Sequence, residues 1–143
     1  MAPPSGQFGT LTDLQNKWGI NTLAAWADLN NTMPAPVADP VRIQAAFDYA
    51  DAFIIDFFRE YGNYATPIVA NDIYTANLLK DWEAVVAGDW LYNSRRIRNA
   101  ETNQEGWVST GIRKAKSEML LHCGVKHLNA ARRWPTATGP VGV

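Results

Sequence analysis

Apolar residues between Asp39 and Gly62 recur at spacings of three and four, which predicts a long amphipathic helix. At about 100° per residue they fill an arc of roughly 140° on one side of that helix. Asp39 can cap its first amides, Pro40 suits its first position, and Gly62 can end it in a left-handed conformation. We expect the chain to be built around this helix. Its buried residues are predicted to be Ile43, Ala46, Phe47, Ala50, Phe53, Ile54, Phe57, Phe58 and Tyr61.

Ile55 breaks this pattern, because it lies among polar residues on the other side of the helix. One interpretation is an isolated exposed apolar residue, which is common on protein surfaces. The other is a contact with a second chain.

The same spacing predicts four further helices, over residues 10–17, 21–29, 71–93 and 108–132. Thr10 or Thr12 can cap the first of these, and Asn71 the third. Gly88 costs about 1 kcal/mol relative to alanine inside a helix, so we expect a bend or a close neighbour there. Residues expected to be buried in the first three are Leu11, Leu14, Trp18, Leu23, Trp26, Leu29, Ile73, Leu79, Trp82, Val85, Val86, Trp90 and Leu91.

The last predicted helix carries two apolar stripes on nearly opposite sides. A helix that is apolar on two sides is sandwiched, either between elements of its own chain or between its own core and a neighbouring molecule. Both arrangements fit the sequence. The first stripe is Val108, Ile112, Ala115, Met119 and Cys123, and the second is Leu121, Val125 and Leu128.

Three segments lack helical periodicity. Residues 1–9 are expected to form an extended arm, and the polar residues 93–106 an exposed loop that carries Arg95, Arg96 and Arg98. The last ten residues, WPTATGPVGV, contain two prolines, two glycines and no charge, so they cannot continue the helix. They are either a disordered terminus or a docking tail that becomes ordered on a partner.

These elements predict an all-α fold, with a bundle of four to five helices over residues 10–133. A long central helix and extended N- and C-terminal arms, residues 1–9 and 134–143, complete the expected organisation. A length of 143 residues with 47% hydrophobic content is enough for one core and too short for two.

Two further features concern the environment of the chain. It has no apolar run of membrane-spanning length and no signal-peptide pattern at its start, so we expect a soluble protein that is not exported. Cys123 is the only cysteine, which excludes a disulfide within the chain and predicts a buried thiol.

Charge is divided unevenly along the sequence. Residues 1–94 carry four basic and eleven acidic side chains, whereas residues 95–143 carry nine basic and three acidic ones. The two parts could pair within the fold, or copies could meet head to tail, acidic flank against basic flank, as in a ring. Nucleic-acid binding by the basic part is a third explanation.

The sequence lacks the motifs of common catalytic and cofactor sites, namely a phosphate-binding glycine loop, a nucleophile elbow, HExxH and paired CxxC. The nearest metal-binding set has two i, i+4 pairs that point about 100° apart, so one ion could hardly use all of it. We therefore expect no metal, no cofactor and no enzymatic activity. That set is Glu118, His122, Cys123 and His127, and the carboxylates assigned to a solvated helix face are Asp48, Asp51, Asp56 and Glu60.

Four stretches follow one another in an order that resembles a known family: TLTDLQNKWG, RIQAAFDYADAFIIDFFREYGNYATPI, KDWEAVVAGDWLYNSR and IRKAKSEMLLHCGV. The family is the small helical head-tail connector, or adaptor, proteins of long-tailed bacteriophages. The resemblance extends from about Thr10 to Leu128. The proline-rich loop from Met33 to Pro40 and the WPTATGPVGV tail depart from the family pattern.

This resemblance implies a non-enzymatic virion protein located in the neck, at the head-tail interface, and made in the host cytoplasm. Family members assemble as a ring, typically a dodecamer, beneath the portal protein. They support the tail or its stopper or terminator protein around a channel through which DNA passes. No membrane is involved. Residues expected to contact the portal or a neighbouring subunit are Arg95, Arg96, Arg98, Leu121, Val125, Leu128, Trp134, Pro135, Val141 and Val143.

The alternative function is a helical DNA-binding accessory protein that acts in packaging or regulation through the basic C-terminal half. Arg113, Lys114 and Lys116 could bind phosphates together with the three arginines of the predicted loop. No recognisable nucleic-acid-binding motif accompanies them, and a pI near 6.1 is unlike that of a dedicated binder.

Overall fold

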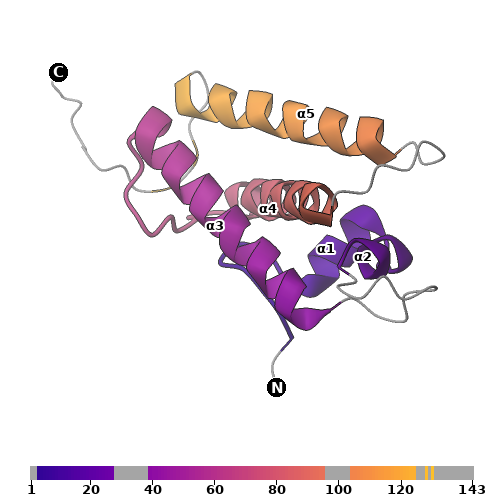
Figure 1. The fold of residues 1–143 in the computed structure, drawn as a ribbon. Coiled ribbons are helices and arrows are strands. Elements are labelled where there is room, and N and C mark those ends of the chain that lie inside the picture. Colours follow the sequence, from indigo (N-terminus) through magenta and orange to yellow (C-terminus); the bar gives the residue numbers. More distant parts are fainter. Residues whose placement is uncertain (1–2, 28–38, 96–103, 125–127, 129, 131–143) are drawn as a thin grey trace, which may run out of the picture.

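The computed structural model describes residues 3–27, 39–95, 104–124, 128 and 130, and confirms the all-α fold (Figure 1). Five helices lie in these ranges, joined in places by segments outside them. They are α1 (Leu11–Trp18), α2 (Ile20–Trp26), α3 (Pro40–Gly62), α4 (Ile73–Arg95) and α5 (Gln104–Gly124). None of these helices has a stretch that is both long and apolar enough to cross a membrane.

The helix at the centre of the bundle is α4, so the expectation that the chain is built around Asp39 to Gly62 is wrong. In Figure 1, α4 lies between α5 and the pair α1 and α2, and α3 crosses it. It contacts all four other helices, whereas α3 contacts α4 and α5. The reason is in the sequences: residues 82–88 of α4 are buried without interruption, but α3 keeps a polar side with exposed Asp48 and Asp56.

Helix starts follow the capping rules, with small shifts from the predicted positions. Thr10 and Asp13 form a capping box at α1, and the Asp39 side chain accepts from the Val41 amide at 2.9 Å, as predicted. At α4 the cap is Asp72, which accepts from the Thr75 amide at 2.8 Å, and not Asn71. Two apolar residues predicted to be buried are exposed because they lie near helix ends: Tyr61 (65% exposed) and Ile73 (74%).

Both helices that flank the predicted loop of residues 93–106 extend into that range. Arg95 belongs to α4 and is not on a loop, and α5 begins at Gln104, four residues before Val108. The side chain of Asn93, the last residue of the predicted helix, donates to the carbonyl and carboxylate of Asp89 at 2.8 and 2.9 Å, so it is satisfied inside the helix. Arg96 and Arg98 lie outside the described residues.

Gly88 has the close neighbour that its position in a helix suggested. A Cβ at Gly88 would overlap the indole of Trp18, whose Nε1 donates to the Ala84 carbonyl at 2.8 Å. Trp26 and Trp107 surround the same indole, with ring centroids 5.3 and 4.8 Å from it. These contacts join α1 and α2 to α4 and α5.

One apolar stripe of α5 faces the core as predicted, whereas Leu128 of the other stripe is not part of the helix. Val108, Ala115, Met119 and Cys123 are buried. The helix ends at Gly124 instead of Arg132, and Leu128, beyond it, is buried against α3 and α4 residues. Leu128 donates its amide to the Tyr64 hydroxyl at 2.7 Å, and that hydroxyl donates to the His122 carbonyl at 3.0 Å.

Candidate functional site

Four aromatic side chains form a ladder along α3, and each is separated from the next by four residues. They are Tyr49, Phe53, Phe57 and Tyr61, and this set is called the aromatic ladder below. Successive ring centroids are 6.2, 6.1 and 4.9 Å apart. Residues at i and i+4 are neighbours on a helix surface, so the spacing alone brings the rings together.

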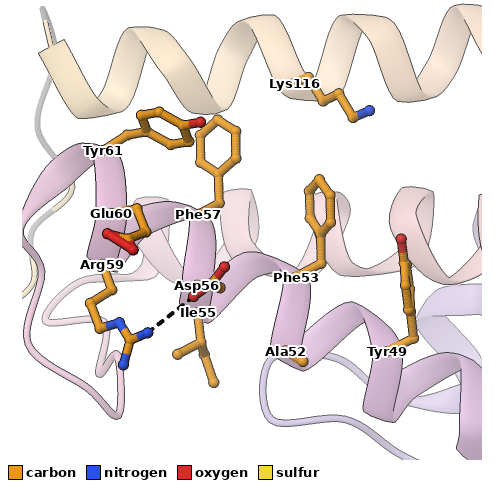
Figure 2. Close-up of a pocket in the computed structure, with 10 residues that line it drawn as sticks. All are labelled: Tyr49, Ala52, Phe53, Ile55, Asp56, Phe57, Arg59, Glu60, Tyr61 and Lys116. Atoms are coloured by element: carbon orange, nitrogen blue, oxygen red, sulfur yellow. Dashed lines mark hydrogen bonds and ion pairs between the residues drawn. The ribbon is translucent and has the colours of Figure 1, made fainter.

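The ladder forms one wall of a groove between α3 and α5 with a volume of about 820 Å³ (Figure 2). In Figure 2 the rings of Tyr49, Phe53 and Phe57 stand side by side and point toward α5. Lys116 is the lining residue from α5, and its ammonium lies 5.7 Å from the centre of the Phe53 ring. The remaining lining residues are Ala52, Ile55, Asp56, Arg59 and Glu60.

Burial differs along the ladder. Phe53 and Phe57 are half-buried and pack on the core cluster that contains Ile54 and Phe58, whereas Tyr49 and Tyr61 are 43% and 65% exposed. The ladder therefore packs against the core on one side and is open to solvent on the other. Ile55 is also half-buried against this cluster, so it is not the isolated exposed residue considered above.

Charges at the rim of the groove balance. Asp56 and Arg59 form an exposed ion pair at 3.1 Å, which leaves Glu60 and Lys116 as one acid and one base. Lys116 also acts on Asp89 of α4: burial raises the pKa of Asp89, and the Lys116 charge partly offsets this. The groove therefore combines an aromatic surface with a rim of no net charge.

The aromatic surface continues beyond the groove at its Tyr49 end. Trp90 of α4 lies 6.3 Å from Tyr49, and the Arg42 guanidinium lies 4.8 Å from the Trp90 ring. This surface is built from α3, α4 and α5 together, so it is as rigid as the helix packing beneath it.

A second polar site lies under residues 5–9, called the N-terminal strap below. The side-chain amide of Gln44 holds the strap, with Nε2 donating to the Ser5 carbonyl at 3.0 Å and Oε1 accepting from the Ser5 amide at 3.2 Å. Asp51 accepts from the Gln7 amide at 3.0 Å. Glu83 of α4, which is fully buried, accepts from the Gly9 amide at 2.6 Å and the Phe8 amide at 3.2 Å.

Glu83 carries the most perturbed carboxyl group described here. Burial, followed by the hydrogen bond to Asp51 and repulsion from that carboxylate, raises the pKa of Glu83 to about 9, against the opposing effect of the Gly9 and Phe8 amides. It is therefore protonated at neutral pH. Oε2 is buried and makes no hydrogen bond among the described residues, so a neutral carboxyl group costs less there than a carboxylate.

The pair of Glu83 and Asp51 is a strap anchor and not an acid-base site. A shifted pKa beside a second carboxylate is typical of catalytic pairs, but those pairs face a cleft. Glu83 has no exposed surface and lies against the strap, where a side chain at Gly6 would overlap its carboxylate. Glu83 is a single acid within the apolar run of α4, and this was the one sign of the site that the sequence carried; it was not among the predicted site residues.

The residues that came nearest to a metal-binding set in the sequence do not converge. His122 Nδ1 donates to the Glu118 carbonyl at 2.8 Å, and Glu118 Oε1 accepts from Trp82 Nε1 at 3.2 Å. Within the part of the chain that the structure describes, no three His, Cys, Asp or Glu residues are grouped so that they could hold an ion. His127 lies outside that part.

Of the predicted partner-binding residues, the three that the structure describes do not line the groove. Leu121 is exposed on α5 next to Leu120, Leu128 is buried and unavailable, and Arg95 ends α4. The sequence pattern had assigned Phe53, Phe57 and Tyr61 of the aromatic ladder to the core, because i, i+4 spacing is shared by core residues and by surface ladders. Predicted residues that lie outside the described part of the chain are Arg96, Arg98, Val125, Trp134, Pro135, Val141 and Val143.

The chain matches no protein-family model, no curated protein and no solved structure. Its function is therefore judged from the site itself. Ring faces in an open groove, with a balanced rim, suit contact with an apolar segment of a protein.

Proposed function

We propose that this chain is a structural protein that assembles with other copies into a ring and serves as a head-tail connector in a bacteriophage virion. The observation that carries the proposal is the aromatic ladder, which leaves Tyr49 and Tyr61 exposed on a rigid surface. Exposed aromatic surface of this kind marks protein interaction sites, where tyrosine contributes both apolar area and a hydroxyl.

The uneven charge along the sequence supports assembly by copies of one chain. Opposite charge on two parts of one subunit favours head-to-tail contacts, and such contacts close into rings. The resemblance to connector proteins supplies the place of the ring, between the portal protein and the tail or its stopper, around passing DNA. In this role the protein needs no catalytic residue and no cofactor.

The proposal is tested by mixing the full chain with purified portal assemblies of the same virus and imaging the product by electron microscopy. The expected result is an added ring at one end of the portal, whose symmetry gives the copy number. Tyr61→Ala should lower the fraction of portals that carry a ring. Tyr74→Ala, at a tyrosine of similar exposure (61%) on α4, is the matched control and should leave that fraction unchanged.

Portals without added density would contradict the proposal, and the same sample then tests the DNA-binding alternative. The outer surface of α5 exposes Arg113 and Lys114, which is the feature in favour of that alternative. Duplex binding in a gel-shift assay that weakens steeply with added salt would support it.

A further inference from the structure

We propose that the groove between α3 and α5 receives the C-terminal segment, residues 134–143, of a neighbouring copy. This inference rests on the proposed function, because it needs copies of the chain to meet. It names the partner of the groove as a second copy and identifies the segment that fills it.

The chemistry of the segment matches that of the groove. Grooves lined by aromatic rings bind proline-rich segments, which are extended before they bind and so lose little entropy. The sequence WPTATGPVGV contains Pro135 and Pro140, one large aromatic residue and no charged side chain. A groove whose rim charges cancel favours neither an acidic nor a basic peptide, so an uncharged segment fits it.

The lengths also agree. Tyr49 and Tyr61 are twelve residues apart on α3, which is about 18 Å along the helix axis. An extended proline-rich segment advances about 3.1 Å per residue, so roughly six residues cover this distance. The ten residues from Trp134 to Val143 are enough to cover the whole ladder and to reach it from an adjacent molecule.

The described part of the chain anchors the start of this segment. Leu128 is buried, and Ala130 packs against the same cluster as Phe57. A Cβ at Gly62 would come 3.2 Å from the Cys123 sulfur, so the ends of α3 and α5 lie together, at the Tyr61 end of the groove. Leu128 and Ala130 therefore hold the chain near one groove, a few residues before the segment begins. If it enters the groove of the next copy, every subunit gives one segment and receives one, which is the head-to-tail contact that closes a ring.

Cross-linking between two single-cysteine variants tests this directly. Ala52→Cys places a thiol in the groove without removing any ring of the ladder, and Val141→Cys places one near the end of the segment. Mixing the two full-length variants under mild oxidation should give a disulfide-linked heterodimer. Ala25→Cys, at an exposed alanine on α2, is the matched control in place of Ala52→Cys and should give at least about tenfold less heterodimer. The buried Cys123 is common to all variants, so the unmodified chain reports its background.

Removing an exposed ring should weaken the cross-link. Adding Tyr61→Ala to the Ala52→Cys chain should lower the heterodimer yield, and adding Tyr74→Ala should not. Equal yields from Ala52→Cys and Ala25→Cys would overturn the inference. A double variant, with both cysteines on one chain, that forms only an internal disulfide would also overturn it, because the segment would then fill its own groove.

The same cross-link, formed on portal assemblies, separates this inference from the proposed function. Rings that assemble normally but cross-link no better than the control would support the connector function. They would also show that the segment does not fill the groove. A specific cross-link between free chains that add no ring to portals would show the opposite, namely self-assembly through the groove without the connector function.

Discussion

Two regions on α3 differ in whether another part of the same chain covers them. On one, Gln44 and Asp51 bind the backbone of the N-terminal strap, which also covers Glu83 and closes that carboxyl group off from solvent. On the other, the aromatic ladder stays open although it is apolar. Burying a carboxyl group is costly and exposing aromatic rings is unfavourable. The strap region therefore serves the folding of one chain, whereas the ladder region is expected to be completed by another.

The largest expected effect on stability is in the buried interior, where α1 packs against α4. Gly88→Ala should destabilise the fold by about 3 kcal/mol, because the new methyl group displaces Trp18 from its hydrogen bond to Ala84. Urea unfolding followed by circular dichroism measures this. Gly111→Ala is the matched control: its Cβ would lie 3.6 Å from the same indole, an ordinary contact. It should stabilise the helix by up to about 1 kcal/mol, and equal losses in both variants would contradict the packing at Gly88.

A smaller effect, which depends on pH, is expected at the strap anchor. An unfolded glutamate ionises near pH 4.5, whereas Glu83 in the folded chain ionises near pH 9. Between these values unfolding releases a proton, so this group lowers the free energy of unfolding as pH rises from 4.5 to 9. Glu83→Gln keeps an acceptor for the strap amides and can donate to Asp51. It should therefore be more stable than the wild type at pH 8 by about 2 kcal/mol.

Thermal unfolding of both chains between pH 5 and pH 9 tests this, with the stability difference growing as pH rises. Asp89 contributes a dependence of the same sign, but it is present in both chains and cancels in the comparison. Glu60→Gln, at an exposed glutamate, should leave the pH profile unchanged. A constant difference between Glu83→Gln and wild type would refute the buried, protonated state.

The smallest effect on stability is expected at two tyrosines that are three residues apart. Tyr64 lies in the buried interior, and Tyr61 lies on the aromatic ladder. Tyr64→Phe should cost about 1 to 2 kcal/mol, because its hydroxyl joins the His122 carbonyl to the Leu128 amide. Tyr61→Phe should change the stability of the isolated chain by less than about 0.5 kcal/mol, since Tyr61 is largely exposed. Denaturant titration of both variants measures the difference, and similar losses would mean that the ladder region is closed as well.

Local rules predicted the helices well. Their number, their type and the N-terminal caps at Thr10 and Asp39 follow from spacing and from side chains close in sequence. The close neighbour at Gly88 could also be predicted, because a glycine inside a helix is unfavourable unless something needs its space. The C-terminal ends of helices were predicted less well. Leu128 was assigned to the last helix because the apolar repeat continues through it, but that helix stops at Gly124.

The sequence by itself determined where the chain is helical and which side of each helix is apolar, because both depend on neighbours within one or two turns. Only the tertiary structure decided what lies opposite each apolar side. Phe58 and Tyr61 belong to one predicted stripe, yet the first is buried under α4 and the second is exposed. The same holds for Glu83, an acid whose burial depends on the strap that folds over it from residues far away in the sequence. Periodicity gives the direction of a side chain on its helix, and only packing gives its environment.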